Sequence, residues 1–371
     1  MMMFLLMKRW LSIKQMRSRV ILGEAKVNAG VLKRVDELVY MEIEPPEIDE
    51  SELLIRVKAA SICGTDLRIF HGKKTKGVRY PSVIGHEFAG EVAQVGDKVT
   101  EFVVGERVCL DPVLPCGGCF YCLNGMENVC QNRVALGYEY DGCFAEYIKI
   151  PSKFITQGNI QKLPTHVPFT VGALAEPLSC VINGQRRLNI SVGDTVVIIG
   201  AGPIGIMHMM VAKASGASKI IVSEPNWMRR ETVGNFGADI TIDPIKQSLK
   251  VMVLEQTDGL GADVVILAIG NPKIVNEALA IARKGGRISL FAGFSAGEMP
   301  PVDVNLIHYN ELVVIGASAL QRRDMKTSVR LIASGAVNLG KLVTDTFPLR
   351  KITEAFAMAE SGEAIKVVLE P

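Results

Sequence analysis

The pattern of hydrophobic and polar positions divides the chain into two parts. In roughly the first 165 residues the two kinds of position alternate over short stretches, as they do in half-buried strands. Strands are expected within residues 18–45 and at 52–60, 88–95, 107–110 and 144–150, with Gly-Asp, Gly-Glu and Asp-Gly turns between several of them. This part of the sequence therefore predicts an antiparallel, β-rich lobe.

From about residue 178 the strands become continuous hydrophobic runs separated by segments of helical length. Six runs are expected, at residues 195–199, 219–223, 239–242, 263–268, 287–291 and 312–315. Continuous β-branched runs that alternate with helices indicate strands buried on both faces of a parallel sheet. We therefore predict an α/β fold whose second part is a doubly wound sheet of six strands, as in a complete dinucleotide-binding domain.

The length of 371 residues favours two domains, because it exceeds what one ordinary core supports. We expect a catalytic domain formed by residues 16–177 and 319–371, and a nucleotide-binding domain at residues 178–318. The last segment is expected to form a helix at 324–334 and then strands that return to the first lobe. Residues 1–15 are expected to be a dispensable extension, with Met16 as the true start, or else an amphipathic surface helix.

Composition and charge exclude several classes of partner. The formal net charge is +2, and it falls to −1 without the three basic residues of segment 1–15, so no basic surface argues for nucleic acid. No apolar run of 18 residues is free of glycine, proline or charge, which argues against a membrane span. The apolar N-terminal run has its charges after it and no cleavage site, unlike a signal peptide.

Four of the eight cysteines lie in one 15-residue window, at positions Cys116, Cys119, Cys122 and Cys130. Four thiolates can enclose one tetrahedral Zn²⁺ at about 2.3 Å, and a closed set of four ligands is typical of a structural site. Two disulfides, or four chance core cysteines, are the alternatives. We predict a structural zinc lobe at about residues 111–132. Thiolates that bind metal suit a reducing, cytoplasmic compartment.

A glycine-rich turn follows the first run of the second part and opens a helix. It comprises Gly200, Ala201, Gly202, Pro203, Ile204 and Gly205. In the dinucleotide-binding pattern Gly200 makes the turn, Gly202 admits the pyrophosphate, and Gly205 lets the helix pack on the strand. The alternative is a glycine-rich turn without a ligand.

An acidic residue, Glu224, ends the next predicted strand, 19 residues after Gly205. Its carboxylate would accept hydrogen bonds from the ribose hydroxyls and repel a 2′-phosphate, which favours NAD over NADP. Arg229 and Arg230 lie nearby, and either could reach a phosphate instead, which weakens this preference.

Further residues that suit a catalytic metal are Cys63, His86, Glu87 and Glu176. Catalytic zinc commonly has three protein ligands drawn from Cys, His and Glu, with one open position. Each residue also has an ordinary interpretation: a core cysteine, a Gly-His-Glu turn, or a Glu-Pro helix start. The spacing alone leaves both interpretations open.

Taken together, these motifs resemble the zinc-dependent medium-chain dehydrogenases, in the branch with sorbitol, threonine and butanediol dehydrogenases. The resemblance extends from Met16 to Pro371 and rests on residues 63–66, 85–87, 176–178 and 200–205 with the four cysteines. It implies a GroES-like catalytic domain, a Rossmann domain, two Zn²⁺ per chain and a catalytic zinc in the cleft between the domains. It also implies a homo-oligomer, a tetramer or a dimer.

The resemblance assigns roles to the individual residues. Cys63 and His86 become zinc ligands, while Glu87 and Glu176 share the remaining positions with water. Zinc would lower the pKa of the substrate hydroxyl, and hydride would pass to the nicotinamide. Thr65 would take the hydroxyl proton, unless it is an ordinary strand-end threonine, and Asp66 would hold the second ring nitrogen of His86.

Departures from the family pattern bear on the substrate. Arg68 stands where a relay histidine is common and cannot release a proton, so the proton would leave through cofactor ribose and water, or through His71. Positions that meet polyol in sorbitol dehydrogenases align with Ile69, Ala319 and Leu320, which argues against sorbitol itself. Arg68 could instead bind a carboxylate or phosphate of the substrate, unless it is solvated or ion-paired.

The sequence thus predicts an NAD-dependent zinc dehydrogenase that oxidises a secondary hydroxyl of a polyol, sugar alcohol or sugar acid. One alternative is a threonine-type amino-alcohol dehydrogenase, and another is a non-enzymatic protein that binds zinc and nucleotide. The remaining cysteines, Cys109, Cys143 and Cys180, are expected to fill the core.

Overall fold

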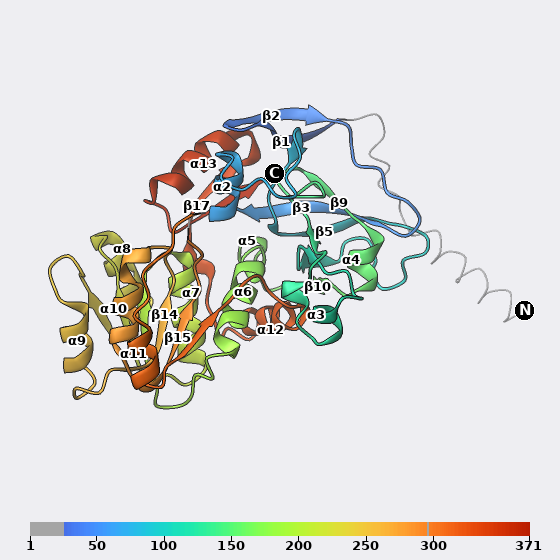
Figure 1. Cartoon of the computed structure of the whole chain (residues 1–371). Coiled ribbons are helices and arrows are strands. Elements are labelled where there is room, and N and C mark those ends of the chain that lie inside the picture. Colours follow the sequence, from blue (N-terminus) through green and yellow to red (C-terminus); the bar gives the residue numbers. More distant parts are fainter. Residues whose placement is uncertain (1–25, 295–296) are drawn as a thin grey trace, which may run out of the picture. The chain divides into compact units, whose positions relative to one another are not determined.

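A computed structural model describes residues 26–294 and 297–371 (Figure 1). The predicted extension at residues 1–15 lies outside this range. The chain forms two compact units, one ending at Glu176 and completed by Val343–Pro371, the other formed by Pro177–Leu342. The first unit is therefore made from two separate stretches of the sequence.

The first unit contains the β-rich lobe that the alternating pattern predicts. Its main sheet has seven strands, six of them in the order β10 (Ile160–Lys162), β6 (Arg107–Leu110), β5 (Glu87–Val95), β3 (Leu53–Ser61), β18 (Lys366–Glu370) and β17 (Val343–Pro348). The seventh, β9 (Tyr147–Ile150), pairs with β3. All neighbours are antiparallel except β17 and β18, which run parallel. The strand β18, near the end of the sequence, therefore lies inside this sheet, between β3 and the edge strand β17.

Smaller elements complete the first unit. A second sheet joins β2 (Glu37–Ile43), β1 (Val27–Arg34) and β4 (Ser82–Val83). In Figure 1, α13 (Ile352–Ser361) lies beside α2 (Gly64–Phe70). The cysteine-rich segment carries β7 (Val113–Leu114), α3 (Phe120–Leu123) and β8 (Val134–Ala135), and short helices α4 (Ser152–Thr156) and α5 (Phe169–Gly172) follow. The shared core includes Leu32, Ile55, Phe88, Phe144 and Leu369.

The second unit contains the predicted parallel sheet of six strands. Their order is β13 (Ile240–Ile242), β12 (Lys219–Ser223), β11 (Thr195–Ile199), β14 (Ala262–Leu267), β15 (Ala282–Leu290) and β16 (Val313–Gly316). With strands numbered along this unit, the order is 3-2-1-4-5-6, as in dinucleotide-binding domains. The prediction of a GroES-like lobe with a Rossmann sheet is confirmed.

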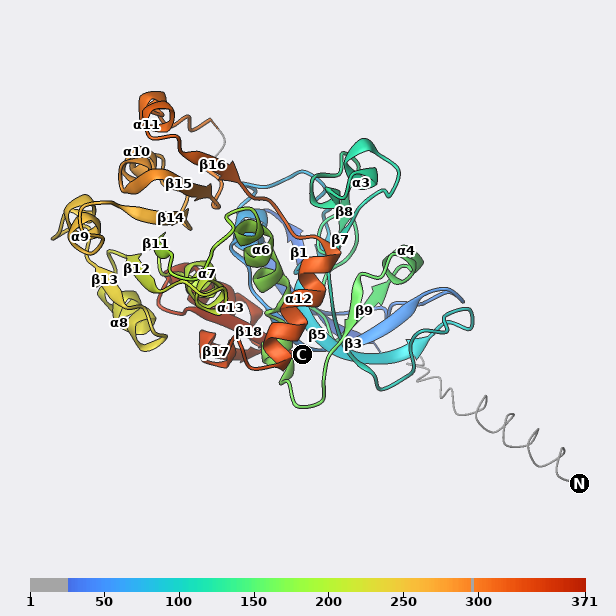
Figure 2. The ribbon, with the colours of Figure 1, turned by 90° about the horizontal axis from the view of Figure 1, so that it is seen from below.

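Helices cover both faces of this sheet, which explains its continuous hydrophobic runs. Figure 2 shows α9 (Leu249–Glu255), α10 (Val275–Ala280) and α11 (Val304–Tyr309) on one face. The opposite face carries α7 (Pro203–Ala214) and α8 (Trp227–Asn235). No helix in the described part of the chain is long and apolar enough to span a membrane.

The boundary between the units falls later than residue 319, where the sequence placed the return to the first lobe. The helix expected at 324–334 is present as α12 (Arg322–Ala333), but it packs in the second unit against α6 (Ala175–Arg186). Arg186 forms an ion pair with Asp324, and the Asn183 amide donates to the Ala319 carbonyl at 2.8 Å. These polar contacts were not visible in the hydrophobic pattern.

Candidate metal and cofactor sites

Three of the residues predicted to bind the catalytic metal lie together. The ligand atoms of Cys63, His86 and Glu87 are all within 4.8 Å of one another. Cys63 is the N-cap residue of α2, while Glu87 begins β5 directly after His86. His86 and Glu87 are buried, and Cys63 is partly exposed, so one side of the group is open. A thiolate, an imidazole and a carboxylate in this arrangement suit a zinc ion with an accessible position.

Asp66 holds His86 in the orientation that metal binding requires. Its Oδ1 atom lies 3.1 Å from His86 Nδ1, and the Asp66 side chain is completely buried. The other oxygen, Oδ2, accepts the backbone N–H of Cys63 at 2.9 Å and closes a capping box at the start of α2. One carboxylate therefore contacts both residues; the contact with His86 was predicted, and the one with Cys63 was not.

Glu87 is held by two residues that the sequence analysis did not identify. Its Oε2 atom accepts hydrogen bonds from the Ser61 hydroxyl and from Lys366 Nζ, the latter at 2.6 Å. Lys366 is 6% exposed and also donates to the Ile62 carbonyl at 2.9 Å. Burial lowers the pKa of Lys366, but the neighbouring acidic groups and the hydrogen bond to Glu87 together outweigh it, so the net pKa lies above its ordinary value.

A signal for Lys366 does exist in the sequence, although it is weak. The lysine begins a short strand in which Val367, Val368 and Leu369 are all buried. A charged residue at the start of a continuous hydrophobic strand is expected to need a buried partner. The partner, Glu87, lies 279 positions away in the sequence, and no local pattern identifies it.

The other predicted catalytic residues lie around this group. Glu176 is 7% exposed and is not a member of the three-residue cluster, but it is close enough to Tyr138 to affect its titration. Thr65 is partly exposed in the first turn of α2, and its backbone N–H donates to the Cys63 sulfur at 3.4 Å. The Tyr138 ring lies 5.6 Å from the His86 ring, and burial raises the pKa of its phenol.

The four clustered cysteines form a second candidate metal site. The Cys119 sulfur lies 3.5 Å from that of Cys122 and 3.7 Å from that of Cys130, and the Cys116 and Cys122 sulfurs are 4.0 Å apart. A tetrahedron of sulfurs at the usual Zn–S distance has edges of about 3.8 Å. These sulfurs therefore fit one zinc ion. Disulfides are ruled out in this arrangement, since all four cysteines are free.

The clustered sulfurs differ in how readily they ionise. Backbone amides of Cys122 and Gln131 lower the pKa of Cys119 to about 6, whereas burial raises that of Cys122 to about 12. Thiolates this close repel one another, so all four ionise together only around a positive charge.

The glycine-rich turn has the geometry of a pyrophosphate site. Gly200 has a φ of +106°, and a Cβ at Gly205 would lie 1.9 Å from the Gly200 carbonyl oxygen. A Cβ at Gly202, the N-cap of α7, would meet nothing within 4 Å. Two glycines are thus needed for the turn and for close packing, and the third leaves open space at a helix N-terminus. Pro203 and Ile204, which form the first turn of α7, are partly exposed there.

Glu224 is buried at the end of β12 and anchored to this turn. Its Oε2 accepts the backbone N–H of Ala201 at 2.8 Å, and Oε1 accepts that of Asn226 at 3.0 Å. A carboxylate has about four acceptor positions, so two remain for ribose hydroxyls. The Arg230 guanidinium donates to the Glu224 and Pro225 carbonyls and pairs with Asp243 at 2.9 Å. It is therefore already bound to groups of the protein. Arg229 lies in the first turn of α8, where its backbone N–H donates to the Asn226 side chain at 3.2 Å.

His71, one of the predicted routes for the substrate proton, has both ring nitrogens engaged. Nδ1 lies 2.6 Å from Asp36 Oδ1, and Nε2 lies 2.8 Å from Glu360 Oε1. The expectation that Cys109 and Cys143 fill the core is confirmed, since both are completely buried, while Cys180 is partly exposed on α6.

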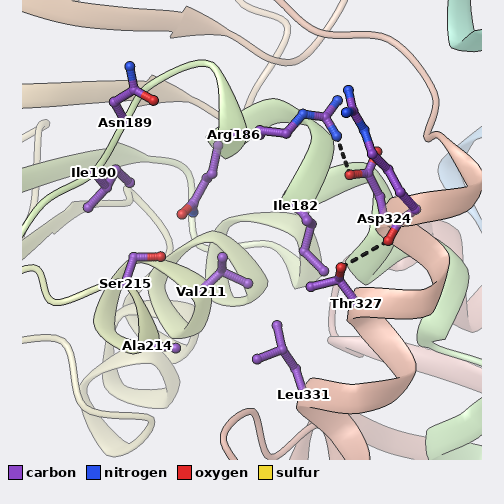
Figure 3. A pocket seen from close by; sticks show the side chains of 12 residues that line it. Ile182, Arg186, Asn189, Ile190, Val211, Ala214, Ser215, Asp324, Thr327 and Leu331 are labelled. Carbon is purple, nitrogen blue, oxygen red and sulfur yellow. Dashed lines mark hydrogen bonds and ion pairs between the residues drawn. The ribbon is translucent and has the colours of Figure 1, made fainter. Parts of the chain in front are cut away.

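A cavity of about 470 Å³ in the second unit contains none of the predicted site residues (Figure 3). It lies among α6, α7 and α12, and Ile182, Val211 and Leu331 line its apolar part. The Arg186–Asp324 ion pair stands at its edge. Its lining has no Cys or His and its one carboxylate is paired, so it is unsuited to the metal chemistry.

The combination of a dinucleotide-type sheet with a three-residue metal site defines a class of protein, the metal-dependent nicotinamide oxidoreductases. Comparisons with known proteins identify the family. The model for the alcohol dehydrogenase GroES-like domain matches residues 49–165, and that for zinc-binding dehydrogenases matches residues 203–334. The chain belongs to the zinc-dependent medium-chain dehydrogenases, in the branch that includes threonine and polyol dehydrogenases.

Individual relatives agree with this assignment. An L-threonine 3-dehydrogenase of Bacillus licheniformis is 37% identical over 94% of this chain and all of its own length. A D-arabitol-phosphate dehydrogenase of Enterococcus avium is 32% identical over 93% and 98% of the two chains. The structure of an alcohol dehydrogenase from Thermus sp. ATN1, 29% identical, superposes with a TM-score of 0.85 over 92% of this chain and 99% of that one. The chain is a dehydrogenase that acts on an alcohol or polyol.

Proposed function

We propose that this dehydrogenase uses NAD to oxidise, reversibly, a secondary hydroxyl of a small polyol-derived substrate at the group formed by Cys63, His86 and Glu87. The observation that carries the proposal is the approach of these three ligand atoms to within 4.8 Å. When bound, zinc supplies a Lewis acid that lowers the pKa of the substrate hydroxyl, and the nicotinamide accepts the hydride.

Neighbouring residues of the chain hold the proposed metal ligands in position. Asp66 orients His86 and caps the helix that carries Cys63, while Ser61 and Lys366 hold the Glu87 carboxylate. We assign Glu176 to a fourth position that it shares with water, and Thr65 to receive the hydroxyl proton. These roles are proposals supported by the burial of Glu176 and the location of Thr65 in the first turn of α2.

NAD is the proposed cofactor, and NADP is the weaker candidate. Gly200, Gly202 and Gly205 would hold the pyrophosphate, and Glu224 would bind the ribose hydroxyls. The buried Glu224 carboxylate supports this choice because it would repel a 2′-phosphate, and Arg230 is committed to other partners. Arg229 is the residue we assign to the adenosine ribose.

The proposal also includes two zinc ions per chain and a cytoplasmic location. We further propose that the protein is a homo-oligomer, either a tetramer or a dimer. The sulfur spacing of Cys116, Cys119, Cys122 and Cys130 supports the second zinc. The absence of disulfides among the cysteines supports a reducing compartment. Strand β16 ends its sheet and carries Val313 at 50% exposure, which supports self-association through that region.

A threonine-type activity is the second candidate, and the 37% identity to a threonine dehydrogenase favours it. Reduction of NAD at pH 8 by the zinc-replete protein, measured with polyols, sugar acids, polyol phosphates and L-threonine, tests both. We expect turnover with a polyol derivative and its loss with a chelator. Turnover with L-threonine alone would replace the first candidate by the second, and no turnover with any hydroxy compound would contradict the proposal.

A further inference from the structure

A run of basic residues begins in the last turn of the helix that Cys63 caps. Segment 68–79 contains five lysines and arginines and no acidic residue. The backbone N–H groups of Lys73 and Lys74 donate to the Arg68 carbonyl at 2.8 Å and 3.0 Å, which folds the segment back against the end of α2. The positive charges are therefore gathered beside this helix instead of extending away from it.

Lys74 is the member of this run that turns toward the interior. Its Nζ lies 4.7 Å from the centre of the Tyr138 ring and is partly buried. Burial lowers the pKa of Lys74, and Arg68, Lys76 and Arg133 are all close enough to lower it further. The nearby acid, Glu139, opposes this effect, but its carboxylate also accepts the Ala135 N–H at 2.9 Å.

The cluster of Arg68, Lys74, Lys76 and Arg133, called the basic cluster below, has more positive than negative charge. Within residues 26–294 and 297–371, neither Arg68 nor Lys74 forms an ion pair with a carboxylate. Glu139 is the one acid acting on Lys74 there. Lys74 is partly buried, whereas Arg68, Lys76 and Arg133 are exposed. Four cations around a single carboxylate favour the binding of an anion.

Tyr138 connects the basic cluster to the proposed metal site. Its ring centre lies 5.6 Å from that of His86 and 4.7 Å from Lys74 Nζ. The preceding Gly137 fixes this position, because a Cβ there would lie 2.6 Å from the Gly85 carbonyl oxygen, next to His86. The Lys74 ammonium and a proposed metal ligand thus lie close to the same aromatic ring within one unit.

We propose that the substrate is a phosphorylated polyol whose phosphate monoester is bound by Lys74 and Arg68 while its hydroxyl is at the metal site. This inference rests on the proposed function. A five-carbon chain with a terminal phosphate ester spans roughly 8 Å at about 1.5 Å per carbon–carbon bond, which suits two sites close to the same aromatic ring. A phosphate carries about −1.5 to −2 charge, which matches several cations better than a carboxylate does. The guanidinium of Arg68 suits its oxygens geometrically.

The test compares arabitol phosphate with arabitol as substrates of the zinc-replete enzyme and of two variants. Lys74→Met removes the cation over Tyr138, and Lys73→Met removes the same charge from the adjacent, exposed position. We expect the wild type to prefer the phosphate in kcat/KM by at least about tenfold. Lys74→Met should lose about tenfold to hundredfold for the phosphate, mainly through KM, and keep its rate with arabitol. Lys73→Met should match the wild type.

A binding measurement makes the test independent of turnover. Inorganic phosphate titrated into the NAD-saturated enzyme should bind to the wild type and to Lys73→Met, and at least about tenfold more weakly to Lys74→Met and Arg68→Gln. Equal phosphate binding by all four proteins would overturn the inference. So would a wild type that oxidises arabitol, gluconate or L-threonine better than the phosphate, while the proposed dehydrogenase function would stand. No turnover with any hydroxy compound, despite phosphate binding, would contradict the proposed function alone.

Discussion

The ammonium group of Lys366 lies 2.6 Å from the Glu87 carboxylate, and both side chains are almost completely buried. Glu87 follows His86 at the start of β5, whereas Lys366 begins the last strand of the chain. The two partners join the two separate stretches of the first unit at the proposed metal site. An ion pair in this position gives the buried carboxylate a counter-charge in place of solvent.

Replacing Lys366 by Met should lower the free energy of unfolding by about 3–5 kcal/mol, because the buried Glu87 carboxylate would lose its counter-charge. Urea unfolding followed by fluorescence measures this loss. The double variant Lys366→Met/Glu87→Gln should recover part of it. Lys98→Met, which breaks the exposed pair with Glu50, should cost less than about 1 kcal/mol. Equal effects of the two single variants would contradict a special role for Lys366.

Replacing Cys119 by Ser should remove the structural zinc and leave the proposed catalytic zinc in place. A metal that binds only the folded chain adds its binding energy to stability, so the thermal midpoint should fall. Zinc content by atomic emission should drop from two to one per chain. Cys180→Ser, the same exchange outside the cluster, should retain both ions. Loss of both metals from Cys119→Ser would show that the two sites are not independent.

Cofactor choice should depend on the charge of Glu224. In Glu224→Gln the repulsion of a 2′-phosphate disappears, so the ratio of kcat/KM for NAD to that for NADP should fall at least about tenfold. Steady-state kinetics with both cofactors measures this ratio. Glu231→Gln removes an exposed carboxylate from α8 and serves as the control. An unchanged ratio in Glu224→Gln would assign the selectivity to other residues.

The stability of the first unit should depend on pH through His71, which lies between Asp36 and Glu360. The hydrogen bond that the His71 ring donates to the Asp36 carboxylate raises the pKa of His71 above 6.5. Protonation is then favoured by folding, so the stabilisation is fully present below the unfolded pKa and is lost as pH rises through the folded pKa. The difference in thermal midpoint between wild type and His71→Gln should be larger at about pH 5.5 than at about pH 8.5. A difference independent of pH would exclude this contribution.

Much of the architecture could be predicted because its signals are local. The runs at 195–199 and 219–223 coincide with β11 and β12. Short continuous runs of β-branched residues favour buried strands over helices. The approach of Cys63, His86 and Glu87 was expected from a resemblance, because no spacing rule connects residues so far apart. The association of α12 with α6 depends on Arg186 and Asp324, which look like ordinary surface charges in the sequence.

The same limit applies to the residues around the proposed metal site. Lys74 resembles its exposed neighbour Lys73 in sequence, and only the fold places it over Tyr138. Ser61 is the last residue of an alternating strand, where a small polar side chain carries no particular signal. These residues meet their partners through contacts between segments that are far apart in the sequence. The pattern of hydrophobic and polar positions gives no information about such contacts.

The position of β18 has a consequence for synthesis on the ribosome. The second unit is one continuous stretch, Pro177–Leu342, and can fold as soon as it leaves the exit tunnel. The first unit begins earlier in the sequence but lacks β18 and Lys366 until residues 366–370 have been translated. The lobe that is made first is therefore completed last, and a nascent chain stalled before residue 366 would carry a finished nucleotide-binding domain beside an open β-sheet.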